Sequence, residues 1–199
     1  MIGIVDYGAG NLHSVRNALD YLGAEARICA EAESLDGCDR LILPGVGAFG
    51  AAMKELAARG LTEPVRRFAQ SGKPFLGVCL GMQMLFDESL EFGCTQGLGL
   101  IPGRVVPIDA GGLPVPHMGW NALSVRFDTA VLRPQDSGQY MYFVHSFRAD
   151  CEPRYVAADA EYGESIPALV ASGNVLGAQF HPEKSGKAGL TLLERFCRM

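Results

Sequence analysis

The sequence predicts a single α/β domain in which a mostly parallel, twisted sheet is flanked by helices. Through residue 86, short apolar runs alternate with helical patterns, as in sheets wound from parallel strands. From Asp87 onwards, glycine, proline and short β-branched runs dominate, which indicates antiparallel hairpins added in the C-terminal half. No linker-like stretch separates the two parts, and 199 residues can bury one full core, so we assign residues 1–199 to one domain.

The first strand is expected at Ile2–Val5, and the following helix should begin after Asn11, which can act as its cap. Gly23 should end that helix. The turn Gly8–Asn11 between them is compatible with a phosphate-binding loop or with a tight strand-to-helix turn. The third glycine of a dinucleotide fingerprint is missing, which favours the second interpretation.

Two more strands and two helices are expected before the centre of the chain. The strand patterns cover residues 24–30 and 40–43, and the helical patterns cover residues 51–59 and the segment that Thr62 caps and Gly72 ends. The loop Pro44–Gly50 contains three glycines, which leave backbone N–H groups uncovered and able to stabilise an anion. An ordinary strand-to-helix loop explains the same residues equally well.

The central feature is Cys79, at which the apolar period changes from that of a strand to that of a helix. Phe75–Val78 precedes it as a buried strand, and Gly77 and Gly81 flank it at two residues' distance, where side chains would clash in a sharp turn. This pattern is typical of a nucleophile elbow with cysteine at its apex. A helix N-terminus beneath the sulfur would favour the thiolate. A small buried thiol at a strand end is the alternative.

The second half should form antiparallel hairpins. Strand-like runs cover residues 103–108, 123–127, 140–147 and 155–160, and Ser172-Gly173-Asn174 predicts a hairpin turn between residues 168–171 and 175–180. A last helix should carry Leu190, Leu193 and Phe196 onto the core.

His181 follows the last of these runs, and Pro182 biases it towards an extended backbone. Side chains two apart on an extended segment face the same side, so Glu183 should lie beside the imidazole. A carboxylate there could hold one tautomer of a catalytic base. A histidine at a strand end with a solvated glutamate is the plain alternative.

The composition narrows the possible partners and compartments. Seventeen Lys and Arg against 22 Asp and Glu give a net charge of −5 without a basic run, so nucleic acid is not expected as a partner. The first residues lack the features of a signal peptide, and no apolar run reaches the roughly 20 residues of a membrane span. Six cysteines without C-x-x-C or metal-ligand spacing are typical of reduced thiols in a cytoplasmic protein, and we expect no metal and no cofactor.

Three motifs together resemble the class I (triad) glutamine amidotransferases: the elbow Cys79–Gln83, the loop Pro44–Gly47 and the closing motif His181–Glu183. The resemblance implies a flavodoxin-like fold. Three further motifs resemble one branch of that family, the glutaminase subunits of imidazole glycerol phosphate synthases in histidine biosynthesis, and these motifs are Asp6–Leu12, Pro116–Asn121 and Tyr142–Ser146. The likeness runs from Ile2 to the last helix, and the segment Asp87–Gln96 departs from the family pattern.

The resemblance implies a glutaminase with a Cys-His-Glu triad. Cys79 would attack the side-chain amide of glutamine, His181 would transfer the proton, and Glu183 would orient His181. The backbone N–H groups of Val46, Gly47 and Leu80 would form the oxyanion hole. Gln83, His145 and Ser146 match substrate-binding positions. The ammonia would pass to a separate (β/α)-barrel cyclase subunit, with which the chain would form a heterodimer.

The partner interface and the ammonia passage are expected at Gly10, Asn11, Met118, Trp120 and Lys184. Trp120 is the only tryptophan and lies in the Pro/Gly-rich loop expected over residues 111–121. It could fill the core or face the partner, since interfaces favour tryptophan and methionine. Two other functions use related sequences, namely a γ-glutamyl hydrolase that needs no partner and a binding subunit without catalysis. An intact Cys79, His181 and Glu183 argues against the second.

Overall fold

The computed structural model describes residues 1–199 and is built on an eight-stranded sheet with the order β2-β1-β3-β4-β14-β13-β12-β9. Its first five strands in that order are parallel, and the last three run antiparallel to their neighbours. The bounds are β1 Ile2–Val5, β2 Ala26–Cys29, β3 Arg40–Gly45, β4 Phe75–Cys79, β9 Ser124–Val125, β12 Val156–Tyr162, β13 Glu164–Ser172 and β14 Val175–Ala178. The mostly parallel sheet and the hairpins added to it are therefore confirmed.

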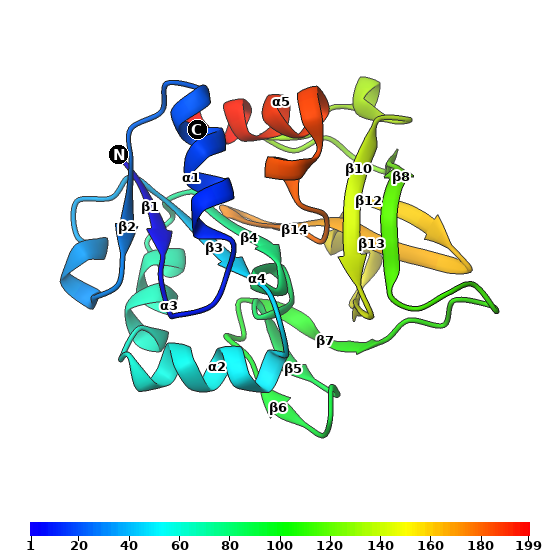
Figure 1. Cartoon of the computed structure of the whole chain (residues 1–199), viewed down its shortest axis with the longest axis horizontal. Helices are drawn as coiled ribbons and strands as arrows, with labels where there is room; N and C mark the ends of the chain where they lie inside the picture. Colours follow the sequence, from blue (N-terminus) through cyan, green and yellow to red (C-terminus); the bar gives the residue numbers. More distant parts are fainter.

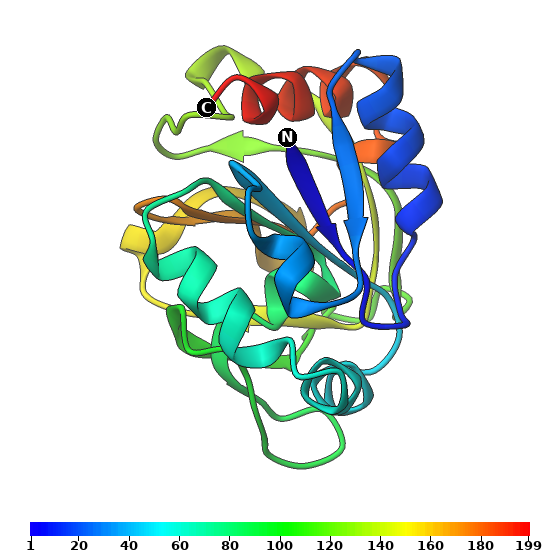
Figure 2. The ribbon, with the colours of Figure 1, turned by 90° about the vertical axis from the view of Figure 1, so that its left-hand side faces the viewer.

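Helices cover both faces of this sheet, as Figures 1 and 2 show. Helices α1 (Leu12–Tyr21) and α5 (Gly186–Cys197) lie over one face, and α2 (Phe49–Ala58) and α3 (Thr62–Gln70) over the other. Successive residues of β3 follow this division, because Leu41 and Leu43 belong to one buried cluster whereas Ile42 belongs to a second one. The strands are thus buried on both sides, which explains their continuous apolar runs.

Two smaller sheets complete the C-terminal half. A two-stranded ribbon consists of β8 (His117–Ala122) and β10 (Tyr140–His145), which pair antiparallel. The other sheet has the order β11-β7-β5-β6, with β5 Phe86–Ser89, β6 Thr95–Gln96, β7 Ile101–Pro107 and β11 Phe147–Asp150. The single strand expected over residues 140–147 is therefore two strands in different sheets. The expected loop over residues 111–121 is also wrong in its second half, where β8 contains Trp120.

A helix follows Cys79 as predicted, but this helix, α4 (Leu80–Gln83), has only one turn, because the chain enters β5 at Phe86. Two capping predictions are wrong. Asn11 occupies the N-cap position of α1 but its side chain makes no capping hydrogen bond. Thr62 is the first residue of α3, and its buried hydroxyl has no partner. In each case the sequence pattern located the start of the helix, but it did not predict the length of the helix or its capping contacts.

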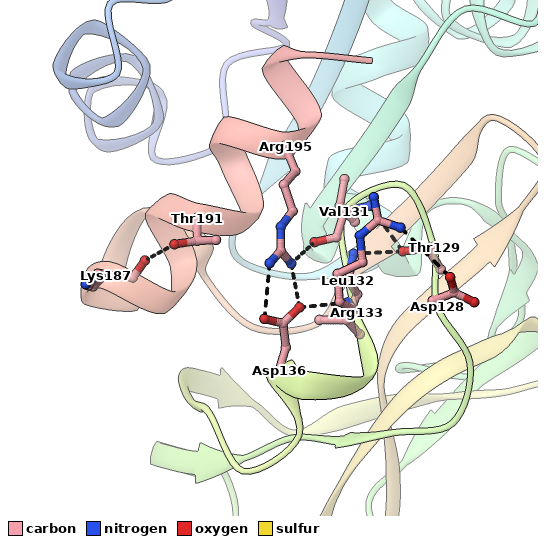
Figure 3. A network of polar contacts seen from close by, with 9 residues as sticks. All are labelled: Asp128, Thr129, Val131, Leu132, Arg133, Asp136, Lys187, Thr191 and Arg195. Carbon is pink, nitrogen blue, oxygen red and sulfur yellow. Dashed lines mark hydrogen bonds and ion pairs between the residues drawn. The ribbon is translucent and has the colours of Figure 1, made fainter.

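The last helix is fastened to the loop that leads into the ribbon (Figure 3). The guanidinium of Arg195 donates hydrogen bonds to the carboxylate of Asp136 and to the carbonyl of Val131. Asp136 also accepts from the backbone N–H of Arg133 at 2.7 Å. Four 3₁₀ turns connect the elements: η1 Ala32–Leu35, η2 Pro134–Asp136, η3 Pro153–Tyr155 and η4 Pro182–Lys184. No helix has the length and apolar character needed to cross a membrane.

Candidate active site

Cys79 ends β4 with a φ of +54°, a conformation that residues with a Cβ rarely adopt. Such a φ makes the chain reverse sharply from strand to helix at the sulfur. The turn needs glycine two residues later, because a Cβ at Gly81 would lie 1.8 Å from the carbonyl oxygen of Leu43. A Cβ at Gly77 would similarly lie 2.6 Å from the carbonyl oxygen of Gly81. The structure thus confirms the shape of the predicted elbow.

The sheet topology brings His181 to the same edge as Cys79. Strand β14 runs parallel to β4 with Ala178 opposite Val78, so the chain leaves β14 beside Cys79. The backbone N–H of His181 then donates to the carbonyl oxygen of Tyr142 in β10 at 2.9 Å. Its own carbonyl oxygen accepts from the hydroxyl of Ser185 at 2.6 Å. The position of His181 is therefore fixed from both β10 and the start of α5.

His181 and Glu183 form a buried pair. Nδ1 of His181 lies 2.8 Å from Oε1 of Glu183, and the two side chains are only 2% and 1% exposed. Burial opposes protonation of His181, but the hydrogen bond to Glu183 and the charges of Cys79 and Glu183 outweigh it and raise its pKa to about 9. Nε2 has no hydrogen-bond partner, so this nitrogen is free to take or give a proton. The predicted neighbourhood of the two side chains is confirmed.

Cys79 and His181 line one cavity of about 450 Å³. Every residue predicted for the oxyanion hole or for substrate binding lies in its wall. The lining residues are Val46, Gly47, Cys79, Leu80, Gln83, Glu91, Phe92, Pro116, Val144, His145, Ser146, Phe147 and His181. Glu183 is not in this wall, and it reaches the cavity only through His181.

The glycine loop lies beside the elbow because β3 pairs with β4 in a register that sets Gly45 opposite Cys79. Val46 and Gly47 follow directly. Beneath them, the hydroxyl of Tyr7 donates to the carbonyl oxygen of Pro44 at 3.0 Å. A Cβ at Gly45 would lie 2.7 Å from that hydroxyl, so glycine is needed there. Burial, with a smaller effect from Cys79, raises the pKa of Tyr7, which therefore stays a neutral donor.

Gln83 is held from two sides at the base of the cavity. Its Nε2 donates to the carbonyl oxygen of Phe147 at 2.9 Å and to Oε1 of Gln179 at 3.0 Å. Nε2 of Gln179 in turn lies 3.9 Å from the sulfur of Cys79. Gln179 was not among the site residues predicted from the sequence. Its signal was a polar residue at the end of an apolar strand, two residues before His181.

Glu91 and Phe92 were also missed, although they lie in the segment that departs from the family pattern. The loop between β5 and β6 carries both residues into the cavity wall. The carboxylate of Glu91 accepts from the backbone N–H of Phe49 at the start of α2, at 2.6 Å. The ring of Phe92 is 93% exposed and lies 6.5 Å from that of Phe147.

The residues expected to face a partner lie outside the cavity. Met118 and Trp120 are 61% and 55% exposed on the outer face of the ribbon, so Trp120 does not fill the core. Tyr142 pairs with Trp120 across the ribbon, and their ring centroids are 6.1 Å apart. Lys184 is exposed and forms no ion pair, and Gly10 and Asn11 are half-buried at the start of α1, which contacts η4. No three His, Cys, Asp or Glu side chains are grouped as metal ligands.

Residues 3–199 match the family described as glutamine amidotransferase class-I. The chain is 50% identical to the imidazole glycerol phosphate synthase subunit HisH of Streptococcus gordonii, over 98% of this chain and 95% of that one. It is 47% identical to the subunit of the same name from Caldanaerobacter subterraneus, over 100% and 98%. Among solved structures, PurLQS from Thermotoga maritima matches with a TM-score of 0.77 and 22% identity, over 99% of this chain and 97% of that one. A chain described as a glutamine amidotransferase matches with a TM-score of 0.76 and 24% identity, over 98% of both.

Proposed function

The chain belongs to the class-I glutamine amidotransferase family, and on this premise we propose that it is the glutaminase subunit of an imidazole glycerol phosphate synthase. It hydrolyses glutamine to glutamate and ammonia, and the ammonia serves a cyclase subunit in histidine biosynthesis. The relatives of that name support this assignment because they align with this chain over nearly the full length of both.

The observation that carries the proposal is the cavity in which Cys79 and His181 meet beside the Val46-Gly47 loop. The sulfur of Cys79 adds to the side-chain amide carbon of glutamine, and His181 takes the thiol proton. His181 then gives this proton to the amide nitrogen, the C–N bond breaks, and ammonia leaves a γ-glutamyl thioester. Water cleaves the thioester to glutamate and returns the thiol.

Glu183 acts on this reaction through His181 alone. Its contact with Nδ1 fixes the ring so that Nε2 is the nitrogen that exchanges the proton. The raised pKa of about 9 means that His181 keeps the proton that it takes from Cys79 until it delivers this proton to the departing ammonia. Glu183 is therefore an orienting residue.

The oxyanion that forms at the amide carbonyl needs donors beside the sulfur. Val46, Gly47 and Leu80 lie in the cavity wall, and backbone N–H donors from such residues are worth about 3 kcal/mol each in related chemistry. Gln83 and the backbone of His145 and Ser146 hold the rest of the substrate. The hydroxyl of Tyr7 supports the loop from below through Pro44.

The outer face of the ribbon is the surface for the cyclase, a (β/α)-barrel subunit with which the chain forms a heterodimer. Met118 and Trp120 offer an exposed apolar surface of the kind that interfaces use. The same ribbon holds His181 through the carbonyl oxygen of Tyr142, so docking on its outside can act on the triad. Gly10, Asn11 and Lys184 border the ammonia passage. The six free cysteines suit a reducing cytoplasm.

The test is a synthesis assay of the complex with Cys79→Ala and a barrel cyclase. Glutamine-dependent synthesis should fall by a factor on the order of 10³ or more, while synthesis from ammonium salts persists. Cys94→Ala, which removes an exposed thiol, is the control and should change neither rate. Glutamine-dependent synthesis that survives Cys79→Ala would refute the proposed function.

A further inference from the structure

His117 and His145 form a buried pair beside the cavity, and the nucleophile–base–carboxylate mechanism leaves their side chains unused. They are 2% and 7% exposed. Nδ1 of His117 lies 3.0 Å from Nε2 of His145. The ring of His117 is stacked between Phe143 and Tyr162, with centroid distances of 4.7 Å and 4.0 Å, so its plane is fixed.

The hydrogen-bond partners determine where each proton lies. The amide of Asn121 has one orientation, since its Oδ1 accepts from the N–H of Ala122 at 2.8 Å and its Nδ2 donates to the carbonyl of Glu161 at 2.9 Å. Nδ2 also lies 3.3 Å from Nε2 of His117, which must therefore accept. In a neutral ring Nδ1 then carries the proton and donates it to His145.

The hydrogen bonds of His145, at the other end of the pair, lead to the same assignment of the protons. Nδ1 of His145 lies 2.8 Å from the carbonyl oxygen of Phe147, which can only accept, so Nδ1 carries the proton. Nε2 of a neutral His145 is then an acceptor for His117. All the hydrogen bonds run in one direction, from Asn121 through His117 and His145 to Phe147. Burial lowers the pKa of each histidine to about 4, which agrees with two neutral rings.

This chain of hydrogen bonds ends at a junction in the cavity wall. The carbonyl oxygen of Phe147 that accepts from His145 also accepts from Nε2 of Gln83. Gln83 continues through Gln179 to the sulfur of Cys79. The first two residues of this hydrogen-bond series, Asn121 and His117, lie on the inner side of β8, and Trp120 is exposed on the outer side of the same strand. The two imidazoles therefore connect the ribbon to the substrate wall.

We propose that His117 and His145 are positioning residues, which hold the wall formed by Phe147 and Gln83 in the geometry that binds glutamine. This role deepens the proposed function and rests on it. Neither ring exchanges a proton with the substrate. Loss of the donor to His145 would leave Nε2 of this ring as an unpaired buried acceptor and would weaken the hold of the ring on the Phe147 carbonyl.

The first test uses the intact protein labelled with ¹⁵N-histidine at pH 7, with each signal assigned through the variant that removes it. Both rings should show a protonated Nδ1 and an unprotonated Nε2, whereas His181 should be protonated on both nitrogens. A protonated Nε2 on His117 or on His145 would overturn the inference, whatever the enzymatic activity is.

The second test compares His117→Phe with Tyr162→Phe in the complex with the cyclase. His117→Phe keeps the aromatic stack but removes the donor, so the KM for glutamine should rise about tenfold with less than a twofold change in kcat. Tyr162→Phe removes only a hydrogen bond to the carbonyl of Pro114 and should keep the wild-type KM. An unchanged KM in His117→Phe, or an equal rise in Tyr162→Phe, would contradict the role. A wild-type complex without glutaminase activity would instead refute the proposed function. If His117→Phe does not fold, the tautomers of His117 and His145 measured in the intact protein decide whether the inference holds.

Discussion

The cavity around Cys79 and the ribbon of β8 and β10 lie side by side, but they expose opposite kinds of side chain. At the cavity, His181 in the wall and Glu183 behind it are both enclosed, at 2% and 1% exposure. On the ribbon the apolar groups are outside, with Met118 and Trp120 more than half exposed. Hydrogen bonds join the two regions, among them those from the N–H of His181 to the carbonyl oxygen of Tyr142 and from Nδ1 of His145 to that of Phe147. In the proposed function, the enclosed region therefore carries the chemistry, whereas the adjoining apolar surface serves a partner.

The strongest test of the enclosed region compares His181→Ala with Glu183→Gln. In the proposed mechanism His181 moves the proton and Glu183 only orients His181, so kcat/KM for glutamine should fall by roughly 10³ in the first variant and by a smaller factor in the second. The measurement is glutamate release in the presence of the loaded cyclase. Equal losses would show that Glu183 carries the proton itself or holds the fold.

A smaller effect is expected on the ribbon. Trp120→Ala should reduce the activation of the glutaminase by the loaded cyclase by about 5- to 150-fold, the usual range of coupling between two sites. Tyr21→Ala is the matched control, because this aromatic side chain is 79% exposed but lies at the end of α1. Activation and melting temperature should both be unchanged in the control. Full activation of Trp120→Ala would show that the outer face of the ribbon is not part of the interface with the cyclase.

Features with a local cause were predicted from the sequence. The elbow is encoded by two glycines and a change of period within seven residues, and the His181–Glu183 pair by their spacing. The first four parallel strands of the main sheet were recognised because their apolar runs alternate with helical patterns along the sequence. Even the exposure of Trp120 was one of two stated possibilities.

Features with a distant cause were not predicted. The His117–His145 contact depends on β8 and β10 pairing in one register across 28 residues. Gln179 matters only because β14 runs beside β4, and Glu91 only because its loop folds back onto α2. Likewise, the glycine-rich segment around Gly119 suggested a loop, because its partner strand could not be known from the sequence. In the structure Gly119 lies inside β8 with a φ of +133°.

The central claim is that Cys79 is activated by His181, and brief alkylation with iodoacetamide followed by mass mapping tests it most directly. Access alone would favour Cys94, which is exposed, over Cys79, which is 6% exposed. A hydrogen bond to Glu88 raises the pKa of Cys94 and keeps it a thiol, whereas Cys79 shares the cavity wall with His181, the base that can take its proton. Cys79 should therefore be labelled before Cys94, whose own labelling should accelerate with pH. Labelling of Cys94 before Cys79 would contradict the account.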